Sequence, residues 1–339
     1  MRRKTRKLAW LATIPLAVLV FAGGAVLLRH PPTGVHIPVA GGFIPLPPVQ
    51  TTVFHFTRSQ TEIHVPFTLD HGSIIINALI NGKPEKCFVD TGSSSVLWNS
   101  CLHLTSQRTG VESSISDAGG RRSNIQEAIL TRIQIGGLDL HNVASDAVTS
   151  SNFETGVGPI LGNSVFAQTV LTIDYSSQEL VIQPPFRYAV MSRIKYPQNV
   201  LDFHWINPDV HGMFGVPCFR AKVMTLPAEM TLDTGWVDNS LGLTEGLYRR
   251  IRPQLKASHS QSLKSSTNFA LGRTSATTVS RVSSSFAGFT LICPGMVVNM
   301  LSPPAQAVLG YEFLRTCRPT IDYPDRKIWF ERVPAAGKK

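Results

Sequence analysis

Residues 88–95 read Phe-Val-Asp-Thr-Gly-Ser-Ser-Ser, and this stretch decides the fold. Its tripeptide Asp-Thr-Gly returns at residues 233–235, and an apolar run precedes each copy. Average residue usage gives any one tripeptide on the order of 0.1 chance occurrences in a chain of 339 residues. Two copies in matching contexts therefore indicate a duplication, which places Asp90 and Asp233 on equivalent loops.

Each copy of the tripeptide opens a longer repeat. A Leu-Gly pair follows at residues 161–162 and again at 309–310, and an Ile-Asp-Tyr triplet follows at 173–175 and at 321–323. The step from the Gly of the pair to the Asp of the triplet is twelve residues in both halves. A unit of about 140 residues that occurs twice predicts a duplicated domain and not a short-period solenoid.

The repeated motifs resemble those of the pepsin-like and retropepsin-like aspartic proteases. The resemblance rests on residues 88–97, 308–315 and 321–323, and it extends over residues 60–332. It implies an all-β, bilobal pepsin-like fold in which two pseudo-symmetric β lobes lie on either side of an active-site cleft. It also implies an aspartic-type endopeptidase without a metal or an organic cofactor, whose substrate is a protein or peptide.

Asp90 and Asp233 are the predicted catalytic residues. Two carboxyl groups a few ångströms apart cannot both ionise cheaply, so the pair holds one proton. The ionised partner then accepts a proton from water, and the protonated partner donates a hydrogen bond to the scissile carbonyl. The pKa values belong to the pair, so the sequence assigns neither role to one residue.

Five further residues are predicted to support the two carboxyl groups. They are Thr91, Gly92, Ser93, Thr234 and Gly235. The resemblance implies that the two threonine hydroxyls bond across the junction of the lobes. The glycines allow backbone N–H groups to approach the carboxylates closely, and the serine is expected to donate a hydrogen bond to Asp90.

Two features depart from the family pattern. Trp236 stands where pepsin-like enzymes have Ser or Thr, which predicts an asymmetric pair in which Asp233 lacks one hydrogen-bond donor. The segment that forms the flap by position, residues 111–126, contains no Tyr. These departures keep a second function open, a non-catalytic module of the same fold that binds a peptide or an envelope partner.

Residues 8–28 form an apolar segment without a charge, and five basic residues precede it. Its 21 residues suffice to span a bilayer, and the charge asymmetry predicts a cytoplasmic N-terminus. An uncleaved signal anchor is favoured because the apolar run continues past the small residues 22–24. A cleaved signal peptide is the alternative. Either reading predicts an extracytoplasmic catalytic part, periplasmic or at the cell surface in a bacterium.

The predicted organisation has five parts. They are a basic stub with the transmembrane anchor (1–30), a linker rich in Pro and Gly (31–58), an N-terminal lobe (59–186), a C-terminal lobe (187–333) and a basic tail (334–339). Both aspartates stand in one chain, so no homodimer is needed to bring them together, and a monomeric catalytic unit is expected.

The net charge of +10 does not indicate a nucleic-acid binder. Eight of the 32 basic residues lie near the chain ends, which leaves 24 basic against 22 acidic residues. The eight are Arg2, Arg3, Lys4, Arg6, Lys7, Arg29, Lys338 and Lys339. A nucleic-acid binder would carry the excess on its folded surface, so no nucleic-acid partner is predicted.

The chain has five cysteines, an odd number that leaves at least one unpaired. Two pairings within one half are candidates for disulfides, Cys87 with Cys101 and Cys293 with Cys317. Buried free thiols are the alternative. No Cys-x-x-Cys motif or local Cys/His cluster occurs, and the ten histidines lack ligand spacing, so no metal site is predicted.

The local pattern predicts strands and turns with few helices. Hairpins are expected at residues 74–89, with Asn81-Gly82 as the turn, and at residues 125–143 and 277–292. Strands are expected at residues 179–182 and 327–330, and short helices at residues 164–168 and 244–252.

Overall fold

The computed structural model divides the chain into two compact units, residues 1–50 and 51–339. It describes residues 36–39, 42–45, 53–56, 62–97, 99–104, 107–116, 122–148, 158–184, 199–206, 215–237, 241–257, 262–269, 272–298 and 304–333. In the first unit, β1 (His36–Val39) and β2 (Gly42–Pro45) pair as an antiparallel hairpin. The predicted membrane segment, the basic tail, most of the linker and the boundary between the predicted lobes lie outside the described residues. In the part of the chain that is described, no helix is long and apolar enough to cross a membrane.

The first half of the second unit is built from short strands. They are β3 (Val53–Phe56), β4 (Ile63–Pro66), β5 (Thr68–Asp70), β6 (Ser73–Ile80), β7 (Lys83–Val89), β8 (Val96–Leu97), β9 (Gln107–Ser116), β10 (Arg122–Ile135), β11 (Leu138–Val148), β12 (Ile160–Leu161), β13 (Val170–Asp174) and β14 (Glu179–Gln183). Its helices are the 3₁₀ helix η1 (Asn99–Leu104) and the short α2 (Asn163–Phe166).

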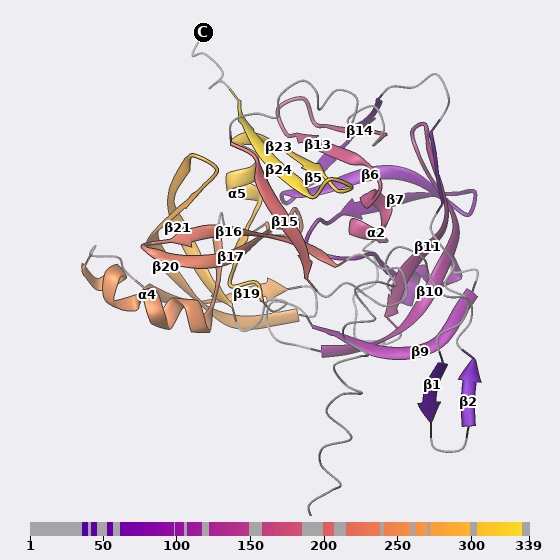
Figure 1. The fold of residues 1–339 in the computed structure, drawn as a ribbon, viewed down its shortest axis with the longest axis horizontal. Coiled ribbons are helices and arrows are strands. Elements are labelled where there is room, and N and C mark those ends of the chain that lie inside the picture. The colour runs from indigo at the N-terminus through magenta and orange to yellow at the C-terminus, as the bar shows by residue number, and fades with distance from the viewer. Residues whose placement is uncertain are drawn as a thin grey trace, which may run out of the picture. The chain divides into compact units, whose positions relative to one another are not determined.

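The second half repeats this order (Figure 1). Its strands are β15 (Leu201–Ile206), β16 (Val216–Val223), β17 (Leu226–Leu232), β18 (Leu241–Thr244), β19 (Ser262–Phe269), β20 (Gly272–Phe286), β21 (Phe289–Val298), β22 (Ala307–Leu309), β23 (Cys317–Asp322) and β24 (Lys327–Arg332). Its helices are α4 (Glu245–Ala257) and α5 (Tyr311–Leu314).

Strand pairing confirms the predicted duplication. In the first half, β12 runs parallel to β7 and antiparallel to β8. In the second half, β22 runs parallel to β17 and antiparallel to β18. The three-stranded arrangement of β9, β10 and β11 likewise returns as β19, β20 and β21.

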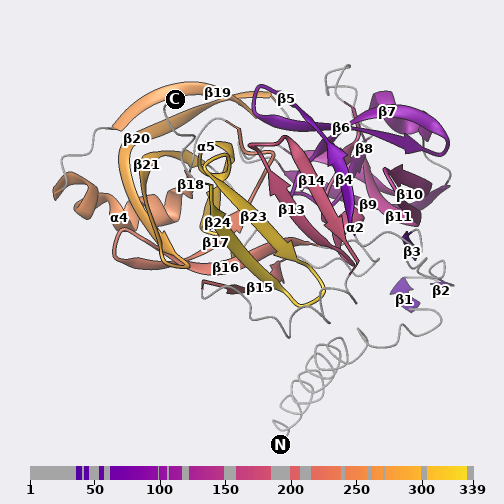
Figure 2. The same ribbon diagram turned by 90° about the horizontal axis from the view of Figure 1, so that it is seen from above.

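A six-stranded antiparallel section, at one end of a 13-stranded sheet, joins the two halves (Figure 2). Its order is β15, β24, β23, β13, β14 and β4, so each half contributes three neighbouring strands. At its centre β13 pairs with β23, and Thr172 lies opposite Thr320 with their hydroxyl oxygens 2.9 Å apart. Because these threonines occupy the same position of the repeat, the pseudo-twofold axis passes between them.

The predicted hairpins are present. Asn81 and Gly82 have φ values of 51° and 80°, the left-handed pair that a tight two-residue hairpin turn requires. Ala287 and Gly288, with φ values of 46° and 74°, make the corresponding turn between β20 and β21.

The predicted helix at residues 244–252 is α4, which continues to Ala257. Leu247, Ile251 and Leu255 are buried along one face at helical spacing. The hydroxyl of Thr244 accepts a hydrogen bond from the Leu247 N–H at 3.3 Å and caps the start of the helix. The second predicted helix, at residues 164–168, is the single turn α2.

All five cysteines are buried and none is in a disulfide, so neither candidate disulfide is formed. Cys87 lies on β7, Cys101 in η1, Cys293 on β21 and Cys317 on β23. The Cys317 thiol instead donates to the carbonyl oxygen of Leu314 at 3.5 Å. Burial raises the pKa of both Cys87 and Cys317 to about 12, which keeps these thiols protonated.

Candidate active site

Asp90 and Asp233 lie on two equivalent loops, each directly after a strand whose last residue is buried. Asp90 follows β7 and Asp233 follows β17. The Asp90 N–H donates to the Leu161 carbonyl at 3.1 Å, and the Asp233 N–H donates to the Leu309 carbonyl at 2.9 Å. The two Leu-Gly segments therefore hold the two loops in the same way, which explains why they recur at matching places in the repeat.

A reciprocal set of hydrogen bonds joins the two loops through Thr91 and Thr234. The N–H of each threonine donates to the hydroxyl of the other at 3.1 Å. The Thr91 hydroxyl donates to the Leu232 carbonyl at 3.0 Å, and the Thr234 hydroxyl donates to the Val89 carbonyl at 2.8 Å. Both side chains are fully buried, so this junction fixes the loops relative to each other, as the resemblance implied.

Gly92 and Gly235 bring each loop against the carboxyl group of the other. A Cβ atom on Gly92 would lie 2.2 Å from Cγ of Asp233, and one on Gly235 would lie 2.7 Å from Cγ of Asp90. Each glycine N–H also donates to the aspartate of its own loop, at 2.8 Å for Gly92 and 2.7 Å for Gly235. The glycines thus let the two carboxyl groups meet.

The environment raises the pKa of both aspartates. Each carboxyl group is surrounded by protein atoms but retains some access to solvent. For Asp90, burial raises the pKa, while hydrogen bonds from Asp233 and from the N–H groups of Gly92 and Gly235 oppose the rise. For Asp233, burial and then the negative charge of Asp90 raise the pKa well above its ordinary value. The two carboxyl groups therefore hold one proton between them as a pair.

The sequence family is consistent with this geometry. The family described as "gag-polyprotein putative aspartyl protease" matches residues 76–168, which include Asp90 and the first Leu-Gly pair. This matched segment and the structural likeness described next together support a peptidase of the hydrolase class.

A solved structure shares the fold of this protease. The crystal structure of an aspartic proteinase from Irpex lacteus matches with a TM-score of 0.50 and 11% sequence identity. The match covers 82% of this chain and 99% of the Irpex lacteus chain. No curated protein matches the chain. The all-β architecture predicted for the folded part is thereby confirmed.

Two neighbours of the aspartates differ from expectation. Within the described residues of the protease, no hydrogen bond joins the Ser93 hydroxyl to Asp90, and the serine instead donates its N–H to the Asp90 carbonyl at 3.4 Å. The backbone N–H of Trp236 donates a hydrogen bond to Asp233 and so lowers the pKa of its carboxyl group. The Trp236 ring is buried and packs in a small apolar cluster with Ala276, Met296, Val298 and Val308.

The sequence did not point to Asn163 and Tyr323, which support the loop that carries Asp90. The Asn163 side-chain amide donates to the carbonyls of Thr91 and Ser93, both at 2.9 Å, and of Gly215 at 3.0 Å. Its Oδ1 accepts a hydrogen bond from the Tyr323 hydroxyl at 2.8 Å. A signal was available, because Asn163 follows the first Leu-Gly pair and Tyr323 ends the second Ile-Asp-Tyr triplet.

The loop that carries Asp233 rests on aromatic packing instead. Tyr311 occupies the repeat position of Asn163, and its N–H donates to the Trp236 carbonyl at 2.8 Å. The Tyr311 ring meets the Tyr175 ring edge-on, with centroids 5.6 Å apart. Among the described residues the buried Tyr175 hydroxyl has no hydrogen-bond partner. One loop therefore rests on a polar network and the other on an edge-on contact between two tyrosine rings.

The predicted flap segment, residues 111–126, forms part of a hairpin. Its strands are β9 and β10, which pair antiparallel with Ser116 opposite Arg122. The turn between them lies outside the described residues. The equivalent pair in the second half is β19 with β20, so the hairpin belongs to the duplicated unit.

Proposed function

We propose that this protease is an endopeptidase that hydrolyses peptide bonds with a water molecule activated between Asp90 and Asp233. The observation that supports the proposal is the reciprocal contact of the two loops, in which each glycine lies against the other loop's carboxyl group. Such an arrangement is what a shared proton requires, since two carboxyl groups so close cannot both be charged at low cost. One chain supplies both groups, which supports a monomeric catalytic unit.

The shared proton gives the two carboxyl groups complementary roles at the start of the reaction. The ionised carboxylate accepts a proton from water while the water oxygen attacks the scissile carbonyl carbon. The protonated carboxyl group donates its proton toward the carbonyl oxygen, where negative charge develops. The amide nitrogen then takes the proton that the first group received from water and leaves as an amine. The carboxyl product returns a proton to the second group, which restores the pair.

The test is cleavage of a diverse peptide library by the full chain over roughly pH 3–8, which brackets carboxyl titration. Asp90→Asn and Asp233→Asn variants run in parallel, with thermal unfolding as the check that each variant folds. We expect cleavage inside the peptides that disappears in both folded variants. Retained cleavage in folded Asp233→Asn protein would contradict the proposal, and release of single terminal residues would indicate an exopeptidase.

We further propose that the protease is anchored in a membrane through residues 8–28 and acts outside the cytoplasm. The support is the uncharged apolar segment, the five basic residues before it and the linker, residues 31–58, after it. The measurement is membrane fractionation with alkaline extraction, together with digestion of intact cells by an added protease. Release of the chain by alkali would contradict the anchor. Full protection of the catalytic part from the added protease, in cells whose outer barrier is opened, would contradict its orientation.

A non-catalytic module that binds a peptide or an envelope partner is the second candidate. Two observations favour it, the Trp236 side chain at a position where the resemblance implies Ser or Thr, and the absence of Tyr from residues 111–126. It predicts a protein that binds library peptides at every pH and cuts none. Cleavage that depends on both aspartates removes it.

A further inference from the structure

Three side chains with metal-ligating atoms meet on one face of the sheet formed by β15, β16 and β17. His204 lies directly opposite Cys218, and Cys218 lies directly opposite Thr231. Glu229 stands two residues before Thr231 on β17, so its side chain points to the same face. The sheet register thus gathers an imidazole, a thiol and a carboxylate that are fourteen and eleven residues apart in the chain.

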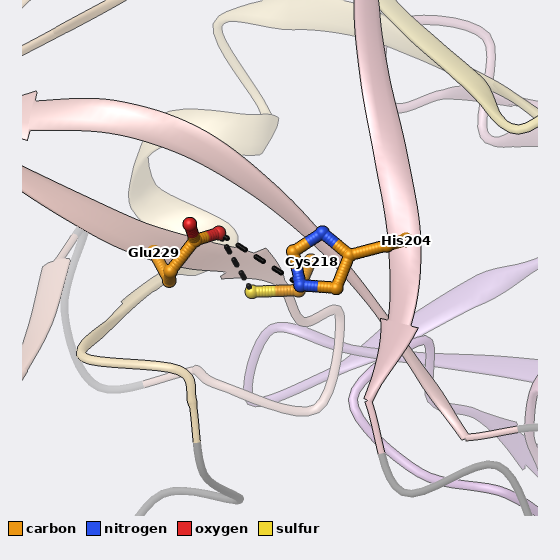
Figure 3. A group of neighbouring side chains, drawn as sticks. All are labelled: His204, Cys218 and Glu229. Atoms are coloured by element: carbon orange, nitrogen blue, oxygen red, sulfur yellow. Dashed lines mark hydrogen bonds and ion pairs between the residues drawn. The ribbon is translucent and has the colours of Figure 1, made fainter. Parts of the chain in front are cut away.

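The three ligand atoms lie almost as close to one another as they would around a bound cation (Figure 3). Glu229 Oε2 lies 3.8 Å from Cys218 Sγ and 3.9 Å from His204 Nε2, and the three ligand atoms lie within 4.8 Å of one another. A tetrahedral zinc ion with bonds of about 2.0–2.3 Å separates its ligand atoms by about 3.3–3.8 Å. Movements of about 1 Å or less, within reach of side-chain rotation, therefore close the site.

The cluster is buried on the side of Cys218 and exposed to solvent on the side of His204. Cys218 is fully buried and packs with Ile206 and Ala305, so the thiol has little competing water. The His204 side chain is 50% exposed, and that of Glu229 is 25% exposed. A cation can therefore enter past the histidine, and water can occupy a fourth coordination position.

The local charges fit a divalent cation. When the ion binds, the Cys218 thiol releases its proton, and the resulting thiolate and the Glu229 carboxylate together carry two negative charges, which a divalent ion offsets. Arg220 is the remaining charged group described beside the cluster, and its Nε lies 3.6 Å from Glu229 Oε1. Its side chain is 93% exposed and contacts the carboxylate oxygen that faces away from the other two ligands. Oε2 therefore remains available to the ion.

We propose that His204, Cys218 and Glu229 bind a divalent zinc-like cation. Sulfur and imidazole ligands favour zinc over magnesium or calcium, so the ligand chemistry selects this class of ion. The expectation of no metal site rested on local sequence spacing, and the strand register supplies what that spacing lacks. The ion would clamp three adjacent strands, of which β17 leads to Asp233, and it has no part in the proposed hydrolysis.

A second contact ties this clamp to the catalytic half-site. The N–H of Gln306 donates to the Glu229 carbonyl at 2.8 Å, just before β22, whose Leu309 holds Asp233. The backbone of one ligand therefore supports the strand beneath the second catalytic loop. Occupation of the site is expected to raise the thermal stability of this half of the protein.

Cobalt titration tests the proposal, because a thiolate bound to Co²⁺ gives a charge-transfer absorption band in the near ultraviolet. The probe is Co²⁺ alone, added to the full chain with its thiols reduced by a phosphine and with no chelator present. We expect the band to saturate at one ion per chain and to be absent in Cys218→Ser. In His204→Ala and Glu229→Gln, affinity should fall by more than the roughly 10–100-fold that loss of an outer-shell partner costs.

Matched controls separate this site from other thiols and histidines. Cys293→Ser removes another buried thiol. His64→Ala removes a histidine that lies 3.0 Å from both Glu62 and Glu179. Its described partners include no cysteine. Both should keep the cobalt band, and so should Asp233→Asn, which distinguishes the site from the catalytic pair. No thiolate band in the natural chain, or a band that survives Cys218→Ser, would overturn the proposal.

A second measurement covers variants that fold poorly. Zn²⁺ should raise the midpoint of thermal unfolding of the natural chain and of Cys293→Ser, and it should leave that of His204→Ala unchanged. His204 is at the surface, so its replacement is expected to leave the fold intact. An equal Zn²⁺ shift in His204→Ala and in the natural chain would place the ion elsewhere and contradict the proposal.

Discussion

At Gly92 the two aspartate loops lie so close together that no side chain larger than hydrogen fits between them. A methyl group there would lie 2.2 Å from Cγ of Asp233, so the Asp233 carboxyl group would have to move away. We expect Gly92→Ala to separate the carboxyl groups and to lower kcat/KM by at least about 10²–10⁴-fold, the usual contribution of general acid–base catalysis. Peptide cleavage at the optimum pH, with circular dichroism to check folding, measures the effect.

Gly246 provides the matched control for that substitution. It lies in the first turn of α4, and nothing stands within 4 Å of the Cβ position. Gly246→Ala should leave kcat/KM unchanged and stabilise the chain by about 0.5–1 kcal/mol, because alanine favours a helix over glycine. A folded Gly92→Ala protein with full activity would show that the two carboxyl groups need not be so close.

The Thr234 hydroxyl serves as both donor and acceptor at the junction of the loops. Thr234→Val keeps the shape but removes the bond to the Val89 carbonyl and leaves the buried Thr91 N–H without its acceptor. We expect a loss of about 1–3 kcal/mol in the free energy of unfolding, the cost of an unsatisfied buried group. Urea unfolding measures it. Thr225→Val, which removes a surface hydrogen bond to Gln254, should cost under about 0.5 kcal/mol, and equal losses in both would contradict the argument.

Among the elements, the single-turn helices α2 and α5 show where the two halves have diverged. Both follow a Leu-Gly strand and lie beneath a catalytic loop, but α2 begins with Asn163 and α5 with Tyr311. Their partners, Tyr323 and Tyr175, occupy equivalent places in the triplet. The two equivalent tyrosines therefore differ in role, because Tyr323 donates a hydrogen bond and Tyr175 packs through its ring.

This pseudo-symmetry supplies an internally controlled test at the element scale. Tyr323→Phe removes the hydroxyl that donates to Asn163 Oδ1, and it should cost about 1–3 kcal/mol because a buried acceptor loses its donor. Tyr175→Phe removes a buried hydroxyl without a partner in the described part of the chain, so it should be neutral or stabilising. Because Asn163 bonds the Thr91 and Ser93 carbonyls, Tyr323→Phe should also lower kcat while KM changes little.

Urea unfolding and steady-state peptide cleavage check both variants. If Tyr175→Phe destabilises the chain as much as Tyr323→Phe does, the hydrogen bond to Asn163 is not what supports the first loop. A loss of stability in Tyr323→Phe with unchanged kcat would leave the tyrosine a purely structural residue.

Local motifs explain which elements could be predicted from the sequence. The catalytic loops, the paired threonines and the Asn81-Gly82 turn each depend on neighbouring residues, and each lies where it was expected. Asn163 and Tyr323 are 160 residues apart, and only the packing of one half on the other brings them together. The Ser93 prediction failed because a hydroxyl's direction depends on a side-chain rotamer that the sequence does not determine.

At the scale of the whole molecule, the six-stranded section makes the two halves one folding unit. Leu171 on β13 and Ile321 on β23 are fully buried and pair across the pseudo-twofold axis. The catalytic pair is formed by this same association, since neither half holds two aspartates on facing loops. Burial of both carboxyl groups therefore lowers the free energy of unfolding of the whole molecule.

That cost predicts how stability changes with pH. Both aspartates have a folded-state pKa above the ordinary value of 3.8, Asp233 the more so, because burial and the neighbouring charge oppose ionisation. Between the unfolded and the folded pKa values the folded state binds more protons, so the contribution of the pair to stability falls as pH rises through this range. Asp233→Asn removes the group that resists ionisation, so the variant should be more stable than the natural chain at neutral pH.

The quantity to measure is the difference in free energy of unfolding between Asp233→Asn and the natural chain, from urea unfolding at several pH values. It should be small below about pH 3.8, where the pair is protonated in both states, and grow toward pH 7. Asp139, whose pKa is lowered by its hydrogen bond with Arg132, contributes stability that is lost as pH falls. It is present in both proteins, so its contribution cancels in the difference. A difference that stays flat or shrinks as pH rises would mean that the two carboxyl groups do not share a proton in the folded protein.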